Sequence, residues 1–368
     1  MANLTYGCSV GANSNVRKII DSTHELRKGG VFNINDIEPK DRHSSNDKRE
    51  LWVDIAKTIT IYLIVFGHLI NNNFICSFLW TFHVPVFFYL SGFLAKHDVP
   101  FLHFLKKLIN RLVIPYFALY LCCMLIKLAY DHASISTIDI INMITAMFAG
   151  SHAYAGFVST PLWFLPSLIT VQLLFYVSYR FRALYLLLII ISLWFYYHHM
   201  INLFMSIDLS LLGINYFVLG VIGRHFAGLI RADRLNTLYP IFFCVSITII
   251  TDLAVHGNVW YTGNSYVLSL AGGIVGVIGM ISFCKIITLG IVGPLKIIIQ
   301  FISENTLFIL AFHSFSNILV LKAFKLLWPG EVGGSLIAAC VAICSIMVLV
   351  PPNLFVVRVM PWIVGARR

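Results

Sequence analysis

Apolar residues dominate this chain in long runs that are separated by short polar clusters. From Leu51 onward, each run is close to the ~20 residues that a helix needs to cross about 30 Å of hydrocarbon. The runs cover residues 51–70, 75–95, 109–130, 160–179, 183–201, 207–226, 236–256, 264–285, 303–326 and 333–357. The stretch 286–301 is also apolar but is interrupted by Gly290, Gly293 and Pro294. The pattern predicts an all-α, polytopic integral membrane protein with about ten transmembrane helices.

Composition and charge agree with this class. The 368 residues are 59% hydrophobic and 11% charged, with a mean hydropathy of +0.85, whereas soluble domains are nearer half apolar and a quarter charged. The net charge is +10, and the basic residues gather in alternate loops between the runs. This distribution follows the positive-inside rule and does not form a nucleic-acid-binding patch. We therefore expect a lipid bilayer as partner, no nucleic acid, and both chain ends in the cytoplasm.

The ends of the chain differ from the apolar part. Residues 1–50 are polar and have no apolar run near the start, so we expect a cytoplasmic tail without a cleavable signal peptide. Residues 51–358 form the predicted transmembrane domain, and 359–368 a short basic cytoplasmic tail. The longest outer segment, 131–159, is expected to hold a partly embedded helix or to line an acceptor groove. The eight cysteines form no CxxC pair, so no disulfide framework and no metal site are expected.

The first run carries ionisable residues, which are costly in a membrane and usually mark a site. Lys57 and His68 are eleven positions apart, almost three whole turns, and so share one helix face about 16 Å apart along the axis. Asp54 lies one turn before Lys57 and can neutralise it. The alternative is that Lys57 and His68 extend to the two membrane interfaces without a further role.

Two later runs add polar groups at a similar depth. His83 stands about two turns into the second run, level with His68, although a packed histidine satisfied by a carbonyl is the structural alternative. In the ninth run, Thr306 and His313 are seven apart and share a face, and Asn305 lies near the inner end. Interhelical hydrogen bonds could account for some of these polar groups.

Basic and aromatic residues flank the runs at both surfaces. Lys107 and Arg111 are spaced i, i+4 at the predicted start of the third run and could pair with phosphates of a donor. The alternative, to which we give equal weight, is that these two charges only set the orientation of the helices in the membrane. Trp163 lies between two prolines at the outer mouth of the fourth run, where sugar stacking competes with interfacial anchoring.

Six pieces of the chain resemble the membrane-bound acyltransferase-3 family, most closely its fucose 4-O-acetylase-like branch and the O-antigen O-acetyltransferases. They occur in the family's order and are WVDIAKTITIYLIVFGH, TFHVPVFFYLSGFL, KLINRLVIPYF, PLWFLPSL, NYFVLGVIGR and SENTLFILAFH. The family typically has Arg where this chain has Lys57, followed by the histidine that is His68 here. Lysine keeps the charge but loses the planar guanidinium fork.

The resemblance implies transfer of an acetyl group from cytoplasmic acetyl-CoA to a hydroxyl of a glycan or lipid-linked saccharide, such as lipopolysaccharide O-antigen, at the outer face of a bacterial inner membrane. A neutral histidine suits removal of a hydroxyl proton, so His68 is the expected base or, alternatively, the first acyl carrier. Lys57 and Asp54 would orient the thioester or offset negative charge, and His83 and His313 would position the acceptor or bind the oxyanion. The remaining expected contacts are Lys107, Arg111 and Asn305 with the donor, and Trp163 and Thr306 with the acceptor.

Two other functions remain open from the residues alone. Intramembrane ionisable groups also suit a transporter or flippase for a lipid-linked glycan, and titrating histidines suit a membrane sensor. Many transporters contain a repeated pattern in their two halves, and the pattern of the first run has no second copy in the later runs.

Overall fold

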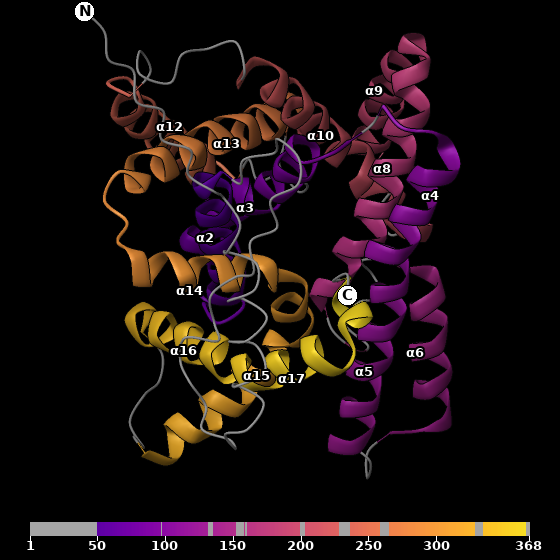
Figure 1. Cartoon of the computed structure of the whole chain (residues 1–368), viewed down its shortest axis with the longest axis vertical. Coiled ribbons are helices and arrows are strands. Elements are labelled where there is room, and N and C mark those ends of the chain that lie inside the picture. The colour runs from indigo at the N-terminus through magenta and orange to yellow at the C-terminus, as the bar shows by residue number, and fades with distance from the viewer. Residues whose placement is uncertain are drawn as a thin grey trace, which may run out of the picture. The chain divides into compact units, whose positions relative to one another are not determined.

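A computed structural model describes residues 50–96, 98–131, 135–151, 158, 160–198, 203–227, 236–257, 265–327 and 334–365. Within these ranges the chain is helical and contains no strand (Figure 1). The predicted tail 1–50 lies outside the described residues except for its last position. The longer helices are α2 (Leu51–Gly67), α3 (Asn73–Phe93), α4 (Phe101–Leu108), α5 (Ile114–Tyr130), α6 (Thr137–Ala149), α8 (Phe164–Arg180), α9 (Arg182–Tyr197), α10 (Ile207–Ala227), α12 (Tyr239–Val255), α13 (Tyr266–Thr288), α14 (Gly293–Glu304), α15 (Thr306–Leu327), α16 (Ser335–Val348) and α17 (Val350–Val359). The short ones are η3 (Ile109–Val113), η4 (Thr160–Trp163), η5 (Phe204–Ser206) and η6 (Pro361–Val364).

The prediction of an all-α, multi-pass membrane protein is confirmed. Among the described residues, seven helices are long and apolar enough to cross a membrane, and each coincides with one of the predicted runs. The other three runs hold the shorter helices α2, α9 and α12, which have 17, 16 and 17 residues. At 1.5 Å per residue, these helices are about 25 Å long, close to the lower limit for spanning.

One predicted boundary was wrong. The third run was expected to begin at residue 109, but a continuous helical segment begins at Phe101 and passes through the π-helix η3 into α5. Lys107 and Arg111 therefore lie inside a 30-residue helical segment and not at its start. The tenth run coincides with the segment Ser335–Val359, which is divided into α16 and α17. Pro351 and Pro352 occupy the first turn of α17, where proline is tolerated.

Helices α2 and α3 lie at the centre of the packed helices. α2 contacts α3, α13, α14, α15 and α16, while α3 also contacts α10, α12 and α13 (Figure 1). The contact between α3 and α10 is close because glycines face backbone on both sides. A Cβ at Gly92 would overlap the carbonyl of Phe217, and one at Gly220 would overlap the carbonyl of Tyr89. Small residues allow such approaches between membrane helices.

Helix α13 uses its glycines in the same way. A Cβ at Gly276 would overlap the side chain of Phe82 on α3, and one at Gly279 would lie 2.7 Å from Cβ of Ser246 on α12. The glycine-lined face therefore packs against two neighbouring helices at once.

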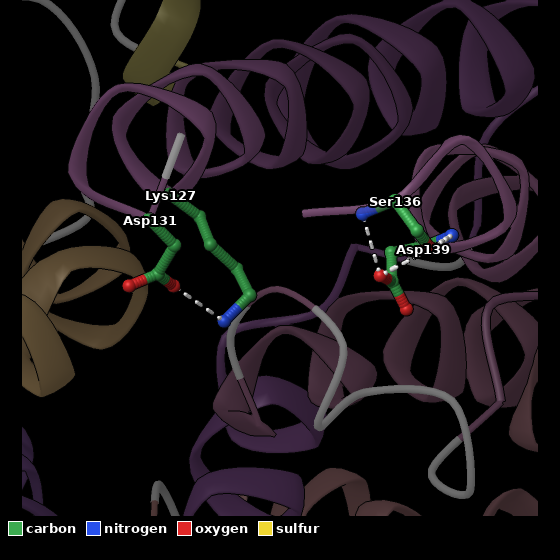
Figure 2. A network of polar contacts seen from close by, with 4 residues as sticks. All are labelled: Lys127, Asp131, Ser136 and Asp139. Atoms are coloured by element: carbon green, nitrogen blue, oxygen red, sulfur yellow. Dashed lines mark hydrogen bonds and ion pairs between the residues drawn. The ribbon is translucent and has the colours of Figure 1, made fainter. Parts of the chain in front are cut away.

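The predicted outer segment holds the helix α6. Ser136 caps its first turn, because its side chain accepts a hydrogen bond from the Asp139 backbone while Asp139 accepts from the backbone and hydroxyl of Ser136 (Figure 2). The Ser136 hydrogen bonds, followed by a smaller effect of Lys127, hold the pKa of Asp139 below its usual value. Close by in Figure 2, Lys127 pairs with Asp131 at 3.2 Å where α5 ends. These contacts stabilise the end of α5 and the first turn of α6.

Candidate functional site

A cavity of about 370 Å³ opens among α2, α3, α4, α8 and α15. Basic residues from three segments face it, together with one carboxylate and several uncharged polar groups. Its polar lining residues are Lys57, Ser91, Lys96, Lys107, Arg111, Gln172, Tyr176, Ser303, Glu304 and Thr306. Aromatic and aliphatic side chains form the rest of the wall, including Phe87, Leu90, Phe104, Phe164 and Leu310. We call this space the inner cavity.

The inner cavity brings together four of the residues that the sequence singled out. Lys57 comes from α2, Thr306 from the first turn of α15, and Lys107 and Arg111 from the helical segment that contains η3. A π-helical turn is rare and often marks a functional site, and here it contains Arg111. With Lys96, four basic side chains face this space against one carboxylate, Glu304, and this excess of positive charge favours an anionic ligand.

Three other predicted residues lie next to this cavity without lining it. The Asp54 carboxylate is buried and accepts a hydrogen bond of 2.6 Å from Ser303, which does line the cavity. This bond ties α2 to α14, and the pairing of Asp54 with Lys57 stays a prediction. Asn305 is buried and donates to the carbonyl of Phe301 at 2.7 Å, where it ends α14. Trp163 is partly buried in η4 beside Phe164, whose ring lines the cavity.

The three predicted histidines lie on or at the end of α2, α3 and α15, which also line the inner cavity. The rings of His68 and His313 are 5.0 Å apart between centroids and nearly perpendicular. His83 lies within electrostatic range of His68. Side chains from α3 and α15 thus gather at the outer end of α2.

Each histidine is fixed by the same kind of contact. Nδ1 lies 2.8 Å from the carbonyl of Ile64 in His68, 2.5 Å from that of Leu79 in His83, and 3.2 and 3.0 Å from those of Ile309 and Leu310 in His313. A carbonyl only accepts hydrogen bonds, so a neutral ring must carry its proton on Nδ1. Nε2 then holds a lone pair, which is the form that a general base needs.

The three rings differ in access. His68 is exposed, whereas His83 is buried and the exposed fraction of His313 is 0%. Nε2 of His313 and Oδ1 of Asn317, one turn further along α15, are buried and have no hydrogen-bond partner among the described residues. Two unsatisfied acceptors one helical turn apart favour the binding of a group that donates hydrogen bonds, such as a hydroxyl or a water.

Lys57 lies on α2 and His68 caps the same helix, but no described cavity has both residues in its wall. His68 is not among the residues that line the inner cavity, whereas Leu310, three positions before His313, is. The expected continuous passage between the two leaflets therefore stays a prediction. Of the three predicted histidines, His313 lies nearest in sequence to a residue of the cavity wall.

Sequence reasoning missed several lining residues. Gln172 and Tyr176 are one turn apart on α8 and face the inner cavity together, and an isolated glutamine in an apolar run was the available signal. Tyr176 stacks on Phe104 at 4.4 Å and donates to the carbonyl of Val99 at 3.0 Å. These contacts fix the start of α4 against α8 and so shape the cavity wall.

Comparison with known proteins identifies the domain type. Residues 50–351 match the model of the family Acyl_transf_3, which is described as an acyltransferase domain. The match includes the inner cavity's basic residues and the three histidines. No significant match to the chain is found among the curated proteins or among the solved structures.

Proposed function

The chain belongs to this acyltransferase family, and we propose that it moves an acetyl group from cytoplasmic acetyl-CoA to a sugar hydroxyl of a bacterial surface polysaccharide, such as O-antigen. The multi-pass protein would act in the bacterial inner membrane. One observation carries the proposal: the three helices that carry the histidine cluster, α2, α3 and α15, also line a cavity with Lys57, Lys107 and Arg111 on its wall. A polyanionic donor and an imidazole base are the two components that such a transfer requires.

The inner cavity suits the donor. Lys107 and Arg111 place two cations one turn apart on its wall, where they would bind the diphosphate of coenzyme A. The apolar part of the wall, including Phe87 and Leu310, suits the uncharged arm that carries the thioester. Lys57, on the part of α2 that lines this cavity, would orient the donor arm as it enters.

The histidine cluster suits the proton transfer. Nε2 of His68 would take the proton of the sugar hydroxyl while the hydroxyl oxygen attacks the thioester carbon. The carbon–sulfur bond then breaks as the ester carbon–oxygen bond forms, and the leaving thiolate takes up a proton from the His68 imidazolium. The alternative order, in which His68 first receives the acetyl group, has the same overall balance. His313 and His83, whose Nε2 lone pairs accept hydrogen bonds, would position the acceptor hydroxyl.

The acceptor would reach the cluster from the outer side. His68 is exposed at the end of α2, which allows a large glycan to bring one hydroxyl to it. Trp163, near the expected outer end of α8, is a candidate for contact with the sugar, whereas Thr306 lines the inner cavity on the donor's side. A wide approach fits a polymeric acceptor better than a closed pocket does.

A matched pair of histidine variants tests this function. His68 and His256 both end a helix and both have Nδ1 2.8 Å from the carbonyl four residues earlier, Ile64 and Asp252 respectively. His68→Ala should reduce transfer from labelled acetyl-CoA to purified surface glycan by about 100-fold to 10,000-fold. His256→Ala removes the same local contact away from the cluster and should leave the rate unchanged.

A second measurement tests whether the acceptor is a surface polysaccharide. Surface polysaccharide from cells with and without the protein is compared by NMR for O-acetyl signals, with protein level and membrane insertion measured in parallel. Near-normal acetylation in the His68→Ala protein would exclude His68 as the base. Glycan movement without consumption of acetyl-CoA would favour the transporter.

A further inference from the structure

A second cavity of about 470 Å³ adjoins the inner cavity. The two share Lys107, Arg111 and Gly365 in their walls. The residues that belong to the second cavity alone are His103, Lys106, Asn110, Ile114 and Trp362. We call this space the basic vestibule.

One wall of the basic vestibule is a single helical stripe. Positions 103, 107, 110, 111 and 114 follow the i, i+4, i+7, i+8 and i+11 pattern of one helix face. His103, Lys106 and Asn110 are exposed. The stripe thus presents cationic and amide donors over about three turns.

The opposite wall comes from η6, near the described end of the chain. Trp362 is 50% exposed, whereas Pro361, Ile363 and Val364 on the same short helix are buried. The buried residues dock η6 against α5 and η3, and this leaves the indole ring in the vestibule wall. Residues 361–365 lie beyond the part of the chain that matches the acyltransferase family, 50–351.

The chemistry of the vestibule points to a planar anionic group. None of its lining residues is acidic, in contrast to the inner cavity, which Glu304 also lines. Lysine and histidine pair with phosphate, and a half-exposed tryptophan offers a face on which a purine can stack. A nucleotide combines both groups in one molecule.

We propose that the basic vestibule holds the adenosine 3′-phosphate end of the coenzyme A donor. Adenine stacks on Trp362, the 3′-phosphate lies by Lys106 and His103, and the diphosphate passes Lys107 and Arg111 where the two cavities meet. The remainder of the donor then extends into the inner cavity. This inference rests on the proposed function and adds a nucleotide subsite that the C-terminal segment completes.

The test compares two donors that differ in the nucleotide alone. Initial rates are measured for the purified protein with acetyl-CoA and with S-acetylpantetheine, which lacks the adenosine phosphates. Trp362→Ala should raise KM for acetyl-CoA by about fivefold to a hundredfold, the range for loss of one stacked base. Lys106→Gln should raise it about tenfold. Neither change should alter KM for S-acetylpantetheine.

Two further variants separate stacking from folding. Trp362→Phe keeps a flat ring and should retain most of the affinity for acetyl-CoA. Trp194→Ala removes a tryptophan that is 51% exposed on α9, outside both cavities, and should leave both KM values unchanged. Binding of adenosine 3′,5′-bisphosphate, measured by calorimetry, should weaken in Trp362→Ala.

Three other results would overturn the nucleotide subsite, and they differ in what they imply for the proposed function. Equal effects on both donors, or no effect on either, would overturn the nucleotide subsite while leaving the proposed function intact. An effect of Lys106→Gln that disappears in nanodiscs without anionic lipid would assign the vestibule to a lipid headgroup and also overturn the proposal. A wild-type protein that consumes no acetyl-CoA would refute the proposed function itself, and the subsite with it.

Discussion

Replacing Gly365 by alanine tests how firmly the C-terminal segment holds the cavity wall. Gly365 follows η6 with φ of 67°, and a Cβ there would lie 2.9 Å from the carbonyl oxygen of Arg111 and 3.4 Å from Cγ of Pro115. The left-handed backbone costs about 1–2 kcal/mol for a residue with a Cβ. Overpacking against backbone costs about 1–3 kcal/mol more. The summed cost, about 2–5 kcal/mol, is large for a short segment near the end of the described chain.

The segment can avoid this cost by leaving η3 and α5. Both cavities would then lose the wall that Gly365 forms and that Trp362 and Val364 extend. We expect Gly365→Ala to raise KM for acetyl-CoA at least about tenfold, which corresponds to 1.4 kcal/mol. Hydrogen exchange of the amides in η6 should become faster, while the midpoint of thermal unfolding in detergent changes less.

Gly257 provides the matched control. Its φ is 70°, but nothing lies within 4 Å of an added Cβ, so Gly257→Ala introduces the backbone strain without the contact. This variant should lose about 1–2 kcal/mol of local stability and keep its KM for acetyl-CoA. If Gly365→Ala matched Gly257→Ala in both KM and exchange of η6, the docking of η6 on η3 would not shape the donor site.

Two further predictions concern packing and pH. Gly92→Val should lower the free energy of unfolding by about 1–3 kcal/mol or more, because its side chain overlaps the Phe217 carbonyl. Thermal unfolding in detergent measures this loss. The control Gly67→Ala should have little effect, because its Cβ would lie 3.6 Å from Leu79. The second prediction concerns α6, where the pKa of Asp139 is lowered in the folded protein. Its carboxylate therefore stabilises the helix at pH values above the unfolded pKa of about 3.9. This stabilisation is lost as the pH falls through the folded pKa. Hydrogen exchange in the first turn of α6 should therefore accelerate below about pH 4 in the wild type, and this dependence should be weaker in Asp139→Asn.

The lengths of the apolar runs located the helices because hydrocarbon thickness fixes how many residues a span needs. The same criterion placed the start of the third run too late. Lys106 and Lys107 precede the apolar run in the sequence, yet α4 already includes them, because Lys107 lines both cavities and Lys106 lines the basic vestibule. A hydropathy pattern reports the average surroundings of a segment, so it cannot detect a polar space between helices.

The candidate site was accessible from sequence to different degrees. Lys57, Lys107, Arg111 and Thr306 were found because charges and hydroxyls are conspicuous against an apolar background, and the structure places them in one cavity. Gln172 and the walls formed by η6 depend on which helix faces meet. That is decided by contacts between residues far apart in the chain, such as the close passage of α3 and α10, and local periodicity carries no information about them.

Helices α2 and α15 each have a polar and an apolar cavity-lining residue before a histidine, although the histidine follows at a different spacing. Each has a polar residue at the inner cavity, Lys57 or Thr306, then an apolar lining residue, Ile61 or Leu310, and then a histidine. Ile61 has an exposed fraction of 0% and Leu310 of 6%, and both belong to one continuous hydrophobic core. Because hydrated phosphates are costly to move into such a layer, the proposed donor would keep its charged end at Lys107 and Arg111.

The apolar layer also separates two kinds of chemistry. In the proposed reaction, the uncharged thioester arm is the part of the donor that can pass Ile61 and Leu310 to reach the histidines. Water from the inner cavity meets the same barrier, so it competes poorly with the sugar hydroxyl for the acetyl group. The barrier further limits proton flow between the exposed imidazole of His68 and the cytoplasmic side. Polar substitutions at Ile61 or Leu310 would therefore increase hydrolysis of acetyl-CoA relative to transfer, and that ratio reports directly on the layer.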